Sequence, residues 1–169
     1  MTRRTTRAWI GLGSNLGDRQ ANLDGALEAL AVVEGIEVLR FSTWIETRPV
    51  GGPSDQPNYL NGVCEIECDA TPEDLLWLLQ AIEIQYGRER RGVPPNSPRT
   101  LDCDLLFYGD EELASPDLVV PHPRMEERLF VLEPLNELEP DMRLPRSKMS
   151  VSERVRELRE QEGRQEERT

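Results

Sequence analysis

The sequence predicts an α+β fold of the ferredoxin-like βαββαβ type, in which a mostly antiparallel sheet carries its helices on one face. Two observations favour this fold. Apolar segments with the period of strands and of helices follow one another in the order strand, helix, strand, strand, helix, strand. The length of 169 residues suits one domain with one main core. We therefore expect a single domain over residues 1–150, with the active site on the second, open sheet face.

The first half of the chain supplies a strand, a helix and a second strand. A strand is expected over residues 8–12, and the glycine-rich stretch 11–17 is interpreted as a tight turn and helix start, because it lacks the ending of a P-loop. The helix that follows ends at Gly35. The second strand is expected over 38–45. Residues 46–58 contain three prolines and a Gly-Gly pair, which predicts a long loop.

The second half repeats this order. Residues 59–68 alternate in polarity and predict a strand. Thr71 before Pro72 is a helix-start signal, and the helix is expected to run to Tyr86. The last strand, over 101–108, ends in a turn at Gly-Asp.

The remainder of the chain is expected to add little regular structure. Residues 118–123 are expected to be extended, with a short helix near 125–129, whereas 134–145 is expected to be irregular. The segment 151–169 is highly charged. We expect it to be a tail that is partly helical at its start and disordered beyond Gly163.

Composition excludes several classes of partner. The net charge of −12 disfavours nucleic acid, which needs a basic face. The sequence contains no apolar run long enough for a membrane span, and three cysteines without a secretory signal favour the reducing cytoplasm. Cys64 and Cys68 share the buried side of their strand, so we expect neither a metal nor a disulfide there.

Two aspartates interrupt the last strand. Because alternate side chains share a face, Asp102 and Asp104 lie on one side and Cys103 on the other. Their Cα atoms are about 7 Å apart. A hard cation such as Mg²⁺ would offset the repulsion between the two carboxylates. The alternative is an exposed strand face at a sheet edge.

Basic residues flank this strand on both sides. Residues 88–99 carry four arginines against one glutamate, in a chain that is otherwise acidic. His122, the only histidine, lies between two prolines and precedes Arg124 and Arg128. Guanidinium and imidazole groups bind phosphate oxygens, so we expect a phosphate site beside the aspartates. The alternatives are a solvated basic loop and a surface histidine.

Several motifs, in this order, resemble those of the 6-hydroxymethyl-7,8-dihydropterin pyrophosphokinase family. They are GSNLGD at 13–18, DQPNYLN at 55–61, Glu83 with Gly87-Arg88, PRTLDCD at 98–104 and VPHPR at 120–124. The resemblance implies the ferredoxin-like α+β fold. It also implies transfer of diphosphate from ATP to the hydroxymethyl group of the pterin, leaving AMP, in folate biosynthesis.

The resemblance also implies site residues. The metal ligands would be Asp102 and Asp104, which would hold two Mg²⁺ ions against the phosphates of the co-substrate ATP. The nucleotide set would be Gln80, Glu83, Arg88, Arg90, Arg99, His122 and Arg128. The catalytic set would be Arg88, Arg90, Arg99, Asp102 and Asp104, with Arg88 and Arg90 on a closing loop. The pterin set would be Thr47, Val50, Tyr59, Asn61 and Phe130.

Two other functions fit parts of this pattern. A nucleotidyltransferase of the polymerase-β type also combines a Gly-Ser turn with an Asp-x-Asp strand, but there the aspartates follow closely, whereas here about 90 residues intervene. A non-catalytic ferredoxin-like module would bind a ligand without turnover. A monomer is the expected oligomeric state.

Overall fold

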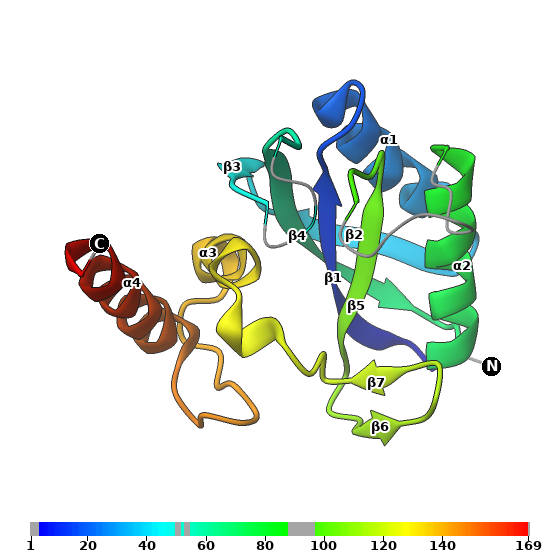
Figure 1. Cartoon of the computed structure of the whole chain (residues 1–169). Helices are drawn as coiled ribbons and strands as arrows, with labels where there is room; N and C mark the ends of the chain where they lie inside the picture. Colours follow the sequence, from blue (N-terminus) through cyan, green and yellow to red (C-terminus); the bar gives the residue numbers. More distant parts are fainter. Residues whose placement is uncertain (1–3, 50–51, 53–54, 88–96, 169) are drawn as a thin grey trace.

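The computed structural model describes residues 4–49, 52, 55–87 and 97–168 (Figure 1). Its main sheet is antiparallel, in the order β2-β4-β1-β5, and the short β3 also pairs with β4. The strands are β1 (Thr6–Ser14), β2 (Ile36–Phe41), β3 (Ile45–Thr47), β4 (Tyr59–Cys68) and β5 (Asp102–Tyr108). The expected antiparallel sheet is confirmed, and β4 has the predicted bounds.

One expected strand is divided in two. The sequence predicted a single strand over 38–45, but β2 ends at Phe41 and β3 begins at Ile45. The Ser42 hydroxyl accepts a hydrogen bond from the backbone N–H of Val63 at 2.9 Å, and the Ser42 N–H donates to the Val63 carbonyl. The side chain of Ser42 thus replaces one ladder bond, and the edge bends there.

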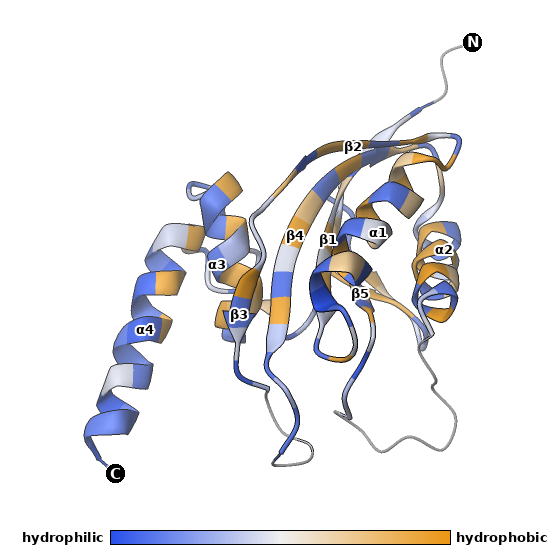
Figure 2. Cartoon of the chain, turned by 90° about the horizontal axis from the view of Figure 1, so that it is seen from above, coloured by the Kyte–Doolittle hydropathy of each residue, from blue (hydrophilic) through white to orange (hydrophobic). Residues whose placement is uncertain are grey.

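Two helices cover one face of the sheet, as predicted. Helix α1 (Arg19–Ala31) is capped by Asp18, and α2 (Pro72–Gln85) is capped by Thr71, whose hydroxyl accepts from the Asp74 N–H at 3.1 Å. Both helices lie on the same side of the sheet in two views (Figures 1 and 2). The three cysteines are free and buried, and they belong to this core: Cys64, Cys68 and Cys103.

The second face of the sheet is not open along its whole length. A second hydrophobic core lies there, in which Trp9, Val63 and Leu106 contact α3 (Leu129–Leu138). Helix α4 (Val151–Glu167) packs on α3, farther from the sheet (Figure 1). The expectation that all helices lie on one face is therefore wrong, and the face is divided between α3 and a pocket.

Helix α3 is the main element that the sequence did not predict. The segment 134–145 was expected to be irregular, yet α3 continues through Pro134 to Leu138. Leu132 and Leu135 are fully buried in the second core. One proline inside a helix costs about 3 kcal/mol. The burial of the apolar side chains of α3 stabilises the helix by more than this amount.

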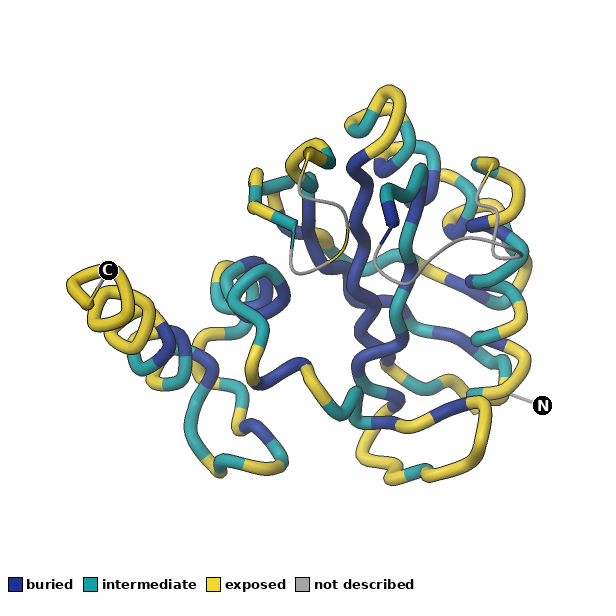
Figure 3. Tube along the Cα trace, in the orientation of Figure 1, coloured by how far each residue is buried: buried dark blue, intermediate teal, exposed yellow. Residues whose placement is uncertain are grey.

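The C-terminal segment forms a helix that starts as expected and is longer than expected. Helix α4 continues past Gly163 to Glu167, with Ser150 as its N-cap. Only its first turns are buried, through Val151, Val155 and Leu158. Its last turns are exposed and hydrophilic (Figures 2 and 3).

Arg40 of β2 attaches the end of α3 to the sheet. Its Nη1 donates to the Leu138 carbonyl at 3.0 Å, and its Nε lies 3.2 Å from the buried carboxylate of Glu65. The guanidinium also lies 5.2 Å from the ring centroid of Trp9, within the range of a cation–π contact. Arg40 also forms an ion pair with Glu139, so it joins Glu65 and Trp9 of the sheet to the C-terminal end of α3.

Shorter elements complete the fold. A hairpin of β6 (Leu113–Ala114) and β7 (Val119–Val120) follows β5, and a 3₁₀ turn, η1 (Met125–Glu127), precedes α3. Among the residues that the structure describes, no helix has the length and apolar character to span a membrane.

Candidate active site

Glycine backbone of β1 forms the floor of a small hollow between the polar side chains of the site. Gly13 of β1 pairs with Asn61 of β4 on one side and with Asp102 of β5 on the other, and Gly11 pairs with Asp104. Paired residues on neighbouring strands present side chains to the same face, so the glycines leave space between the polar groups. A Cβ atom at Gly13 would lie only 2.6 Å from Asn61 Oδ1. Gly11 lies in the strand that was expected over 8–12, whereas Gly13 also belongs to this strand, so its interpretation as part of a turn is wrong.

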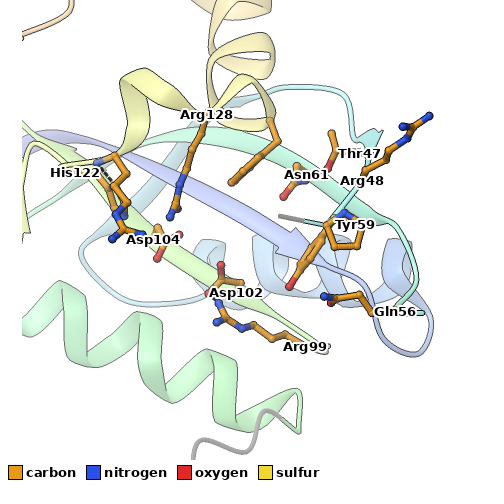
Figure 4. A pocket seen from close by; sticks show the side chains of 13 residues that line it. Thr47, Arg48, Gln56, Tyr59, Asn61, Arg99, Asp102, Asp104, His122 and Arg128 are labelled. Atoms are coloured by element: carbon orange, nitrogen blue, oxygen red, sulfur yellow. Dashed lines mark hydrogen bonds and ion pairs between the residues drawn. The ribbon is translucent and has the colours of Figure 1, made fainter. Parts of the chain in front are cut away.

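A pocket of about 300 Å³ lies next to this floor (Figure 4). The pocket and the hollow share Asn61, Asp102, Asp104 and Phe130. It brings together nine predicted site residues from both halves of the chain: Thr47, Tyr59, Asn61, Arg99, Asp102, Asp104, His122, Arg128 and Phe130.

The acidic side of the pocket is formed by β5. Asp102 and Asp104 are half-buried and both line the cavity, as the strand period predicted. Arg99 Nη1 lies 3.2 Å from Asp102 Oδ1, so cation and carboxylate are neighbours. On the opposite side of β5, the backbone N–H of Cys103 donates to Glu83 Oε2 at 2.9 Å. Glu83 thus holds the strand between the two aspartates.

Cationic and imidazole groups face the aspartates from the segment after β7. The His122 N–H donates to the Leu106 carbonyl at 2.9 Å, and its Nδ1 accepts from the Arg124 N–H at 3.2 Å. Nε2 therefore carries the proton of the neutral ring. Burial lowers the pKa of His122, and the charge of Arg128 lowers it further. The histidine is thus a neutral N–H donor beside the arginines.

The other end of the pocket is aromatic and amide-lined. Asn61 is buried, and its Nδ2 donates to Thr47 Oγ1 at 2.5 Å. The ring of Phe130 lies at the start of α3, 5.5 Å from the guanidinium carbon of Arg128. This end can hold a flat polar ring, with hydrogen bonds at its edge and stacking on its face.

Some predicted residues do not line this pocket. Gln80 and Glu83 lie on α2, on the helix-covered side of the sheet, and neither lines the cavity. Val50, Arg88 and Arg90 lie outside the described residues.

Sequence reasoning missed four lining residues: Arg48, Pro49, Gln56 and Arg124. Two had a signal in the sequence, because Gln56 lies within the quoted stretch 55–61 and Arg124 directly follows the Pro-His-Pro segment. Arg48 and Pro49 had none beyond the neighbouring Thr47.

Comparison with known proteins agrees with this geometry. The family model of 7,8-dihydro-6-hydroxymethylpterin-pyrophosphokinase (HPPK) matches residues 9–140. The 2-amino-4-hydroxy-6-hydroxymethyldihydropteridine pyrophosphokinase of Synechocystis is 44% identical over 89% of this chain and 75% of its own length. The enzyme of the same name from Pseudomonas aeruginosa is 42% identical over 82% of this chain and 84% of its own.

Solved structures agree in fold. A Plasmodium falciparum HPPK-DHPS with pterin and p-hydroxybenzoate matches with a TM-score of 0.74 and 13% identity. The match covers 97% of this chain and 45% of that one, so the chain spans less than half of this larger protein. The sequence matches and the shared fold lead to one conclusion: the chain belongs to the 7,8-dihydro-6-hydroxymethylpterin-pyrophosphokinase family.

Proposed function

We propose that the protein transfers diphosphate from ATP to the hydroxymethyl group of 6-hydroxymethyl-7,8-dihydropterin, giving AMP and the pterin diphosphate, as a step of folate biosynthesis. The observation that carries this proposal is the pocket itself. One cavity joins a carboxylate pair, four arginines and a histidine, and an amide-and-aromatic end. Family membership supports the same reaction. We also infer that the frame is ferredoxin-like, that the protein is a cytoplasmic monomer, and that nucleic acid is not a partner.

The donor set of β5 fits Mg²⁺. Asp102 and Asp104 offer hard oxygen ligands from one strand face. Among the described residues, no group of three or more Asp, Glu, His or Cys side chains is placed to hold a metal ion together. A cation with two protein carboxylates completes its coordination with phosphate and water oxygens, which is the usual binding mode of Mg²⁺. When bound, Mg²⁺ would neutralise charge on the ATP phosphates. We propose two ions, held by these two aspartates.

The basic side chains would orient the transferred group. Arg99, Arg128 and the Nε2–H of His122 would donate hydrogen bonds to phosphate oxygens, which hold the β-phosphorus in line with the acceptor. Arg88 and Arg90 are proposed to join them, and Gln80 and Glu83 remain proposed members of the nucleotide side.

The pterin would occupy the amide-and-aromatic end. Asn61 and Thr47 would bind its polar edge, Phe130 would stack on its ring, and Tyr59 and Val50 would complete the wall. In the reaction, the hydroxyl oxygen bonds to the β-phosphorus while the bond from that phosphorus to the α–β bridging oxygen breaks. AMP leaves with the bridging oxygen, and the hydroxyl proton passes to solvent. The rate enhancement comes from positioning and charge neutralisation.

The decisive test is Asp104→Ala. AMP formation from ATP and hydroxymethyldihydropterin should fall at least a hundredfold, because removal of one electrostatic group at a charged transition state costs on the order of 100-fold or more. Asp110→Ala, an exposed aspartate just after β5, is the matched control and should keep wild-type activity.

The products separate the alternatives. A nucleotidyltransferase would release diphosphate and attach AMP to its acceptor. A binding module would show no Mg²⁺-dependent turnover. Full activity of Asp104→Ala would remove the metal assignment.

A further inference from the structure

Asn15 is a buried polar residue next to the pocket, although it does not line it. It directly follows β1 and is 0% exposed. A buried amide must have its donors and acceptor satisfied, and the partners that satisfy it show what it holds in place. The side chain of Asn15 forms hydrogen bonds with two segments that are distant in sequence, the loop before β4 and the segment before β5.

The amide nitrogen of Asn15 binds the loop before β4. Nδ2 donates to Gln56 Oε1 at 2.9 Å and to the Pro57 carbonyl at 3.0 Å. Gln56 lines the pocket, and the same loop leads into Tyr59 of the proposed pterin end. Both donors of the amide therefore fix the acceptor side of the cavity.

The amide oxygen of Asn15 binds the segment before β5. Oδ1 accepts from the Arg99 N–H at 2.8 Å, and the backbone N–H of Asn15 donates to the Arg99 carbonyl at 3.0 Å. Arg99 lines the pocket and contacts Asp102. This half of the side chain fixes the phosphate side.

We propose that Asn15 is a positioning residue that holds the pterin-binding loop and the phosphate-binding segment at a fixed separation across the pocket. This role rests on the proposed function. Among side chains of this size, only an amide can donate to two carbonyl oxygens and accept from an N–H at the same time. An aspartate keeps the acceptor and loses both donors, whereas a leucine of similar shape loses all three bonds.

The two variants therefore separate the two halves of the role. Asn15→Asp should raise the KM for the pterin about tenfold, because two hydrogen bonds to the acceptor loop are lost, and should change the KM for ATP less than about threefold. Asn15→Leu should raise both KM values about tenfold. Asn22→Leu is the matched control. Asn22 lies near the same turn and donates to Ser14 Oγ and to the Leu16 carbonyl, but to neither loop.

A second pair of variants tests the same contact if substitutions at Asn15 prevent folding. Gln56→Glu and Gln56→Leu both remove the Gln56 amide nitrogen, but only glutamate keeps the oxygen that accepts from Asn15. We expect a pterin KM several-fold higher for Gln56→Leu than for Gln56→Glu.

The experiment measures AMP formation against each substrate, with thermal unfolding of every variant. Equal increases of both KM values in Asn15→Asp, or equal pterin KM values for the two Gln56 variants, would overturn the proposal, since a purely structural role does not distinguish the substrates. Wild-type protein without AMP formation would instead reject the proposed function.

Discussion

The glycine floor gives a sharp prediction through two alanine substitutions on one strand. In Gly13→Ala, the new Cβ would lie 2.6 Å from Asn61 Oδ1, well inside the distance of normal contact. Asn61 must move, and its hydrogen bond to Thr47 is strained or lost. Losing one buried polar contact costs about 1–3 kcal/mol, which corresponds to about a 5- to 150-fold rise in the KM for the pterin.

Gly11→Ala is the matched control. There the nearest atoms to a new Cβ belong to Leu106, at 3.5 to 3.7 Å, which is ordinary contact. Alanine inside a strand gains about 0.5–1 kcal/mol over glycine, so this variant should be at least as stable as wild type. Its pterin KM should stay within about threefold of the wild-type value, because the new methyl group displaces no hydrogen-bonded side chain of the pocket.

The assay is AMP formation as a function of pterin at saturating ATP, with thermal unfolding in parallel. The Asn61→Ala background adds a strict check: once Asn61 is truncated, Gly13→Ala should have little further effect on the pterin KM. Equal pterin KM values for Gly13→Ala and Gly11→Ala would refute the reasoning.

Three further predictions concern buried groups. Glu83→Ala should lower the free energy of unfolding by about 2 kcal/mol, because the Cys103 N–H loses a charged acceptor, and should raise the Mg²⁺ requirement; Gln85→Ala on the same helix should do neither. If metal-free ATP binding weakens instead, Glu83 contacts the nucleotide directly. The pKa of His122 is lower in the folded protein than in the unfolded chain, so as the pH falls through 6.5 the unfolded chain takes up a proton at His122 before the folded protein does. The free energy of unfolding therefore has its full value above pH 6.5 and decreases below it. His122→Gln should lose less stability than wild type between about pH 7.5 and pH 5.5 in denaturant titrations, and an equal loss would contradict this account. Burial raises the pKa of Cys64 to about 12, so a disulfide reagent should modify this thiol only after unfolding; rapid reaction in the native protein would show that the core opens.

The sequence was most informative where the signals are local. The Thr71 cap and the strand over 59–68 were predicted from neighbouring residues in the chain, and both are confirmed. The aspartate pair was also predictable, because the strand period alone fixes which face it occupies. The pairing that places Gly13 between Asn61 and Asp102 is not local, so Gly13 was misinterpreted as part of a turn.

Helix α3 was missed for the same reason. Pro134 is a strong local breaker, and only the distant surface of Trp9 and Val63 makes a helix favourable there. Arg99 and His122 were expected in one site and do line one cavity. That Gln56 lines the same cavity was not predicted, because its position depends on how the loop before β4 is held.

The second core connects the pocket to helix α4, which contributes no residue to the pocket lining. Phe130 stands at the start of α3, and α3 is supported by the inner face of α4, mostly beyond the residues that match the family model. Val155 lies on that inner face, 25 residues after Phe130 in the sequence. Mutations there should change the affinity for the pterin, although Val155 does not line the pocket. The outer face of α4 is under no such constraint, so the two faces of one helix should drift at different rates during evolution.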